Sequence, residues 1–93
     1  MRVRWTAHAV NQLGSIGAYI GQHNPAAAAS IMKRLYNATD ALTRFPMMGH
    51  EGRLPGTREL SVPGTPYIIP YRIAGDRIDV LAVFHGAQSR DLP

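Results

Sequence analysis

Four side chains in the second half of the chain could together cleave RNA without a metal. Arg58, Glu59, Arg72 and His85 lie on three neighbouring predicted strands. Cleavage through the 2′-hydroxyl needs a base for the 2′ proton, cations for the crowded phosphate, and an acid for the 5′ leaving oxygen. Arg58 and Arg72 could hold the phosphate through paired N–H donors. His85 could be the acid or the base, because an imidazole titrates at about pH 6.5.

The strand pattern also allows a purely structural role for these residues. Side chains alternate along a strand, so Tyr71 and Arg72 point to opposite faces and cannot both line one site. His85 could instead end its strand and hydrogen-bond a backbone carbonyl. Both interpretations of His85 stay open at the level of the sequence.

The chain is basic, and almost all of its positive charge is arginine. Ten Lys and Arg stand against six Asp and Glu, the formal net charge is +4, the pI is about 10.1, and Lys33 is the only lysine. Arginine suits planar, bidentate contact with carboxylate or phosphate. Two kinds of partner therefore fit this surface, nucleic acid and an acidic protein, beside the simpler interpretation of a solvated basic face.

Neither a metal site nor a cofactor is expected. The chain has no cysteine, and His8, His23 and His50 lack the spacing of metal ligands. The first five residues are not followed by an apolar stretch, and no run approaches the roughly 18 apolar residues of a membrane span. We therefore expect a soluble, cytoplasmic protein.

Hydrophobic spacing predicts a short strand and two helices in the first half. Residues 2–5 alternate as a strand, and Thr6 can cap a first helix that Gly21 would end. Asn24 and Pro25 supply the N-cap and first turn of a second helix, which Pro46 should end near Phe45. Apolar residues spaced by threes and fours line one face of this helix: Ala28, Ile31, Leu35, Ala38, Leu42 and Phe45.

The second half predicts a loop followed by three strands. Residues 46–57 are rich in Gly and Pro, and after them the apolar period changes from 3.6 to 2. Strands are expected over residues 58–62, 67–73 and 78–85, joined by short turns as an antiparallel meander. The last strand should be central and covered on both sides, since both of its faces are largely apolar. Pro70 requires a bulge or an unpaired N–H side in the middle strand.

These elements define an α+β protein of order β-α-α-β-β-β, with a helical hairpin packed on a small, mainly antiparallel sheet. A chain of 93 residues supports one modest core, so residues 1–93 are expected to form a single domain.

This order, with particular phrases, resembles the RelE/ParE superfamily of type II toxins, and ParE-like members most of all. The phrases extend over nearly the whole chain: Arg44-Phe45-Pro46, Gly49-x-x-Gly52-Arg53, Pro55-Gly56-Thr57-Arg58-Glu59-Leu60, Tyr67-Ile68-Ile69-Pro70-Tyr71-Arg72-Ile73, and residues 78–88. ParE-like members often carry an aliphatic residue where this chain has Pro70.

The resemblance implies a toxin neutralised by a cognate antitoxin in a hetero-oligomeric complex, and it leaves two activities open. ParE-like members poison DNA gyrase, whereas RelE-like members cut mRNA on the ribosome. Nucleolytic relatives tend to carry lysines near the meander and an aromatic or basic residue after the last strand. This chain has no lysine near the meander, and it ends Gly86-Ala87-Gln88-Ser89-Arg90-Asp91-Leu92-Pro93, without an aromatic residue.

We therefore expect a non-enzymatic, ParE-like gyrase inhibitor. The alternative is a RelE-like mRNA interferase, a metal-independent endoribonuclease with Arg58, Arg72 and His85 as its catalytic residues. A third hypothesis is that the protein keeps the toxin fold only to bind an antitoxin and has little activity of its own. Candidate contacts for the antitoxin or the target are Arg34, Arg44, Arg58 and Arg72.

Overall fold

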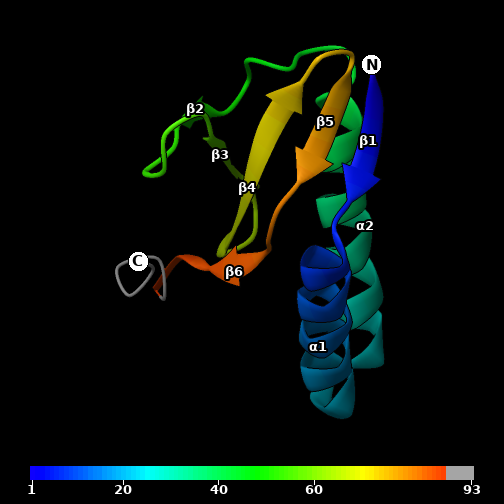
Figure 1. The fold of residues 1–93 in the computed structure, drawn as a ribbon. Helices are drawn as coiled ribbons and strands as arrows, with labels where there is room; N and C mark the ends of the chain where they lie inside the picture. The colour runs from blue at the N-terminus through cyan, green and yellow to red at the C-terminus, as the bar shows by residue number, and fades with distance from the viewer. Residues whose placement is uncertain (88–93) are drawn as a thin grey trace.

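A computed structural model describes residues 1–87, and its elements follow the predicted order (Figure 1). Two helices are flanked by six strands: β1 (Arg2–Trp5), α1 (Ala7–His23), α2 (Pro25–Ala41), β2 (His50–Glu51), β3 (Arg58–Ser61), β4 (Tyr67–Ala74), β5 (Arg77–Val80) and β6 (Phe84–His85). No helix in this part of the chain has the length and apolar character needed to cross a membrane.

Local capping explains where the helices begin. The Thr6 hydroxyl accepts the Ala9 N–H at 3.2 Å and caps α1. Asn24 serves both helices, because its backbone N–H donates to the Ile20 carbonyl at 2.9 Å while its side chain accepts the Ala27 N–H at 3.0 Å. The prediction that Gly21 ends α1 was wrong. The helix continues to His23, since Asn24 supplies a better end than a glycine inside the last turn.

The predicted end of α2 was also wrong. The helix ends at Ala41, and the next residues form tighter turns in which the Arg44 and Phe45 N–H groups both donate to the Ala41 carbonyl. Phe45 is 60% exposed and lies outside the apolar stripe that its spacing suggested. Pro46 disfavours helical geometry at Phe45, so the chain leaves the helical path before the stripe is complete.

The sheet has the strand order β1-β5-β4-β3-β2, with β6 also paired to β4. β1 runs parallel to β5, and the other pairs are antiparallel. The short β2, inside the predicted loop, was missed because two residues carry no periodic signal. β5 is central as expected, between β1 and β4. The prediction that this strand is covered on both sides was wrong, because the helices pack only on the face that carries Ile78 and Val80.

The predicted strand over residues 78–85 is two strands, because a bulge interrupts it. Tyr71 pairs with Val80 and Ile68 with Phe84, so three steps along β4 face four steps along the opposite chain. The extra residue lies opposite Pro70, which has no N–H to offer a continuous ladder. The bulge therefore falls in the neighbouring strand, and the Leu81 N–H still donates to the Pro70 carbonyl at 2.9 Å.

The helices cover one face of the sheet. Leu35 of α2, Leu42 at its C-cap and Ala9 of α1 form a buried cluster with apolar residues of β3, β4 and β5: Leu60, Ile69, Tyr71, Ile78 and Val80. Figure 1 shows the joined ends of α1 and α2 extending beyond the sheet. Because side chains alternate along each strand, the intervening residues face away from the helices. We call that side the open face.

Candidate functional site

Four arginines gather on the open face around one carboxylate. Arg4, Asp79 and Arg72 are register partners across β1, β5 and β4, and Arg2 pairs with Arg77 one row further out. Neighbouring strands lie about 4.8 Å apart, and same-face residues along a strand lie about 6.7 Å apart. The arginine patch, defined as Arg2, Arg4, Arg72 and Arg77, therefore has backbone anchor points within an area of roughly 10 by 7 Å.

Asp79 binds two of the four arginines of this patch, Arg4 and Arg77. Its carboxylate is buried and accepts two hydrogen bonds from Arg77, at 2.7 Å from Nε and 3.3 Å from Nη2. Arg4 adds an ion pair at 3.3 Å. The hydrogen bonds from Arg77, then the nearby charges of Arg4 and Arg72, hold the pKa of Asp79 below its usual value despite its burial. The same contacts raise the pKa of Arg77.

The other half of the patch is free to bind a ligand. Arg2 and Arg72 are exposed, and within residues 1–87 their guanidinium groups make no hydrogen bond or ion pair. Asp76, in the adjoining turn, adds one more negative charge near Arg77. Four cations against two carboxylates leave an excess of two positive charges, so the patch suits an anionic partner.

The open face becomes apolar beyond the arginine patch. Along β4, Arg72 is followed on the same face by Pro70 and then Ile68. Glu59 is the register partner of Pro70 and Phe84 that of Ile68, while the Leu81 N–H donates to the Pro70 carbonyl. A groove of about 270 Å³ lies here; we call it the apolar groove, and it is lined by Arg53, Leu54, Thr57, Glu59, Pro70, Leu81, Ala82 and Phe84. The Glu59 carboxylate accepts the Arg53 N–H at 3.3 Å at its rim.

Arg58, predicted as a phosphate ligand, is used inside the protein. It pairs with Tyr71 in register and therefore lies on the helix side of the sheet. Its guanidinium donates to the Gly49 carbonyl, at 3.0 Å from Nε, and to the Met47 carbonyl at 3.2 Å. Tyr71 binds the same loop, since its hydroxyl donates to the Pro46 carbonyl at 2.6 Å and accepts the Gly49 N–H at 3.0 Å. Arg58 thus holds the loop between α2 and β3.

The structure does not bring Arg58, Arg72 and His85 into one site. His85 is the register partner of Tyr67, four residues before Tyr71 on the same strand, so it also lies on the helix side. Arg72 alone faces the open side. The His85 ring packs edge-on against Tyr67 with centroids 5.8 Å apart, and its Nδ1 accepts the Ala87 N–H at 3.1 Å. No carbonyl contact of the kind predicted for His85 is present among the described residues.

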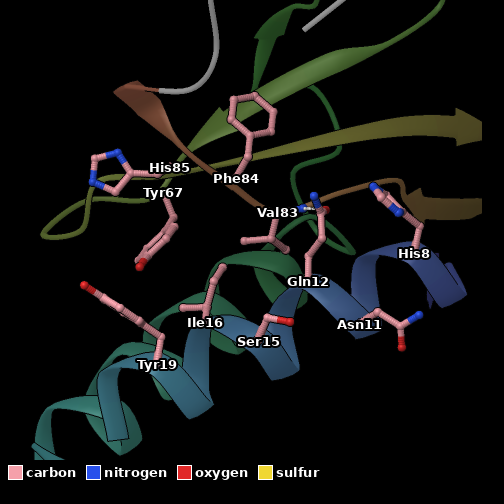
Figure 2. A pocket seen from close by; sticks show the side chains of 10 residues that line it. All are labelled: His8, Asn11, Gln12, Ser15, Ile16, Tyr19, Tyr67, Val83, Phe84 and His85. Atoms are coloured by element: carbon pink, nitrogen blue, oxygen red, sulfur yellow. Dashed lines mark hydrogen bonds between the residues drawn. The ribbon is translucent and has the colours of Figure 1, made fainter. Parts of the chain in front are cut away.

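His85 lines a groove between α1 and β6 (Figure 2). Figure 2 shows its ring beside Tyr67, with Tyr19 and Ile16 of α1 facing them. Further along, the Gln12 side chain accepts the Val83 N–H at 2.7 Å, and the Thr6 hydroxyl donates to the Leu81 carbonyl at 3.2 Å. Helix α1 thereby satisfies the backbone groups that the bulge frees, which gives this groove a structural role.

Of the two remaining arginine candidates, Arg34 lies on α2 and Arg44 lies in the turns that follow it. The Arg34 Nη1 donates to the Pro63 carbonyl at 3.5 Å, beside the turn that joins β3 to β4. Arg44 forms an exposed ion pair with Asp40 at 3.6 Å. Neither belongs to the arginine patch. In residues 1–87, no group of three His, Cys, Asp or Glu side chains is placed to hold a metal ion.

Sequence reasoning found one member of the arginine patch, Arg72. It missed Arg2, Arg4, Arg77 and Asp79, although the alternating Arg2-Val3-Arg4 and Arg77-Ile78-Asp79 phrases put each set on one strand face. The missing information was the parallel pairing of β1 with β5, which joins opposite ends of the chain.

A helical hairpin over a mainly antiparallel sheet defines the class of fold seen in solved toxin–antitoxin complexes. The structure of a chromosomal ParDE system from P. aeruginosa has a TM-score of 0.83 at 23% identity, over 91% of this chain and 95% of that chain. The RelBE2 complex of Mycobacterium tuberculosis gives a TM-score of 0.60 at 26% identity, over 90% and 95%.

Sequence comparison narrows the class to a family. A model of the ParE toxin of the type II toxin–antitoxin system parDE matches residues 3–90. Toxin Y4kP of Sinorhizobium fredii is 47% identical over 94% of this chain and 90% of that protein. Toxin RelE2 of Caulobacter vibrioides is 33% identical over 94% and 97%. The chain belongs to the ParE toxin family, within the ParE/RelE superfamily of type II toxins.

Proposed function

We propose that this protein is the toxin of a ParDE-type pair that stops growth by binding DNA gyrase and trapping its cleaved-DNA state. A cognate antitoxin neutralises it in a hetero-oligomeric complex. Such a target would be met in the cytoplasm. The antitoxin is supported by the solved ParDE and RelBE2 complexes, and the gyrase target rests on the resemblance to ParE-like toxins.

One observation carries the proposal that this chain does not cut RNA: its three candidate catalytic residues do not converge. Arg58 is held by loop carbonyls, His85 lies on the helix side, and Arg72 lies on the open face. General acid–base cleavage requires these groups within hydrogen-bond reach of one phosphate. A chain without that convergence would act by binding.

A RelE-like mRNA interferase is the second candidate, and two observations favour it. Relatives named toxin RelE2 and toxin RelE1 are 33% and 35% identical to this chain. Arg72 also presents an unpaired guanidinium on a basic sheet face, where it could hold an RNA phosphate. In that case Arg72 would act with partners other than Arg58 and His85.

Expression without the antitoxin separates the two functions. Gyrase poisoning predicts chromosomal breaks and an SOS response, with intact ribosome-bound mRNA. Codon-positioned cuts in mRNA without DNA breaks would refute the proposal. The variant His85→Ala should stay fully toxic, because His85 only packs on Tyr67 and accepts the Ala87 N–H; loss of toxicity in a folded His85→Ala protein would favour the interferase.

A further inference from the structure

We propose that the open face of the sheet binds the antitoxin through one amphipathic acidic segment. The apolar side chains of that segment fill the apolar groove, and at least two carboxylates beside them reach the arginine patch. This inference rests on the proposed function, because it names the surface and the chemistry through which neutralisation occurs.

The apolar groove supplies the first half of the argument. Pro70, Leu81 and Ala82 are only partly buried, and Leu54 at the rim is 55% exposed, so apolar area remains in contact with water. The helices cannot cover it, since they pack on the opposite face. At roughly 25 cal/mol per Å² of apolar area removed from water, a partner side chain such as Leu or Phe gains free energy by entering the groove.

The arginine patch supplies the second half, because of its charge and its spacing. Its excess of two positive charges needs two additional carboxylates for neutrality. Its two rows lie two residues apart along β1 and β5, or about 6.7 Å. Acidic residues at i and i+2 of an extended segment have the same separation, and those at i and i+4 of a helix lie about 5–6 Å apart. Either segment can place one carboxylate on each row.

The two halves are continuous and lie in a fixed order. Arg72 and Pro70 are two residues apart on β4 and share the open face. Asp79 lies on this face in β5, and Leu81, which directly follows β5, lines the groove. A partner that crosses from groove to patch must therefore change from apolar to acidic within a few residues. The adjacency of the apolar groove and the arginine patch therefore favours one continuous binding surface over unrelated surface charges.

A nucleic acid fits the open face less well than such a segment. A phosphate backbone is charged along its whole length, whereas Arg53 is the single cation among the residues that line the groove beyond Arg72. Beyond it a phosphate chain would lie on apolar side chains and meet the Glu59 carboxylate. Like charge in that position is repulsive, and Arg53 alone would have to compensate for the hydration lost over the apolar floor.

The test uses the chain co-expressed with the small protein encoded by the adjacent reading frame. We would purify the complex, separate and refold the components, and measure the Kd at 100 mM and 300 mM NaCl. Arg2→Gln and Arg72→Gln remove unpaired guanidinium groups, and Leu54→Glu adds a charge at the groove rim. The matched controls are Lys33→Gln, an exposed cation on α2, and Met47→Glu, an apolar loop residue that is 63% exposed.

We expect each of the three open-face variants to raise the Kd about tenfold or more. The two arginine variants each remove a charge-assisted contact, and Leu54→Glu places a charge against the apolar side chains of the partner. The two control variants should stay within about twofold of the wild type. Modification of arginines with phenylglyoxal should be slowed by the partner at Arg2 and Arg72, and unchanged at Arg34. Wild-type affinity should weaken at 300 mM NaCl.

Three results would overturn the inference. If all open-face variants bind with wild-type affinity and still arrest growth, the antitoxin docks elsewhere, and the toxin function stands. If a mixed-sequence 20-base-pair duplex binds more tightly than the antitoxin and loses affinity in the same arginine variants, the face serves nucleic acid. If the wild-type chain neither arrests growth nor binds the adjacent gene product, the proposed function itself fails.

Discussion

Replacement of Tyr71 by phenylalanine tests how the loop after α2 is held. Tyr71 is fully buried, and its hydroxyl joins the Pro46 carbonyl at 2.6 Å to the Gly49 N–H at 3.0 Å. Tyr71→Phe keeps the ring and removes only that bridge. Two hydrogen bonds contribute about 0.5–1.5 kcal/mol each, and a buried N–H left without a partner costs about 1–3 kcal/mol.

The expected loss of unfolding free energy is therefore about 2–3 kcal/mol. For a domain of this size, each kcal/mol lowers Tm by roughly 4–8 °C, so a fall of roughly 8–24 °C should be observed. The assay is urea unfolding followed by circular dichroism, with thermal unfolding as a second measurement. Tyr36→Phe is the matched control, since Tyr36 is 63% exposed and its change should stay within about 0.5 kcal/mol.

A loss below about 0.5 kcal/mol in Tyr71→Phe would refute this reasoning, because it would mean that solvent replaces both partners of the hydroxyl. An equal loss in Tyr36→Phe would refute it too, since the effect would then not come from the buried bridge. Arg58 donates to the Gly49 and Met47 carbonyls of the same loop, so its replacement offers a second, independent test of how much the attachment of this loop stabilises the fold.

Three further perturbations test local features of the fold. Asn24→Ala removes the side-chain acceptor of the Ala27 N–H, so stability should fall by about 1 kcal/mol in urea unfolding; an unchanged value would mean that water caps α2 equally well. Gly75 has φ +62° with open space around it, so Gly75→Ala should cost about 1 kcal/mol through backbone strain alone, and Gly75→Asn less; a stabilised alanine variant would contradict that cause. Asp79 has a lowered pKa in the folded protein, so its contribution to stability is present above the unfolded pKa of about 3.9 and is lost as pH falls through the lower folded pKa. The Tm of the wild type should therefore fall more steeply on acidification through that range than the Tm of Asp79→Asn, and parallel curves would show that the ion pairs with Arg4 and Arg77 contribute little.

The parts of the fold that the sequence predicted depend on neighbours along the chain. Asn24 and Pro25 start α2 through a side chain and a ring that act within three residues. Gly64 and Gly75 both adopt positive φ in the turns that were placed at residues 63–66 and 74–77. The β-α-α-β-β-β order and the mainly antiparallel sheet follow from such signals.

The missed features depend on contacts between distant residues. The break between β5 and β6 arises because Pro70 lies opposite it and because Thr6 and Gln12, more than seventy residues earlier, bind its backbone. Phe45 continues the apolar spacing of α2, yet its side chain is 60% exposed. Spacing along one helix carries no information on where the facing surface ends.

The candidate site was predictable only in part, for the same reason. Arg72 was recognised from its strand and from the family phrase around it. The face that it shares with Arg4 and Asp79 follows from the register of β1 on β5 and of β4 on β5. Likewise, the separation of Arg58 from Arg72 follows from the pairing of Arg58 with Tyr71, which places it on the opposite face.

Gyrase cleavage in vitro is the most direct test of the central claim. Purified chain would be incubated with DNA gyrase, ATP and supercoiled plasmid. The reaction would then be stopped with detergent and treated with protease, so that DNA cleaved by gyrase is released before electrophoresis. We predict linear plasmid that accumulates with toxin, that disappears when the antitoxin is added, and that forms equally with His85→Ala. Absence of gyrase-dependent linear DNA, together with cleavage of ribosome-bound mRNA by the same preparation, would contradict the claim.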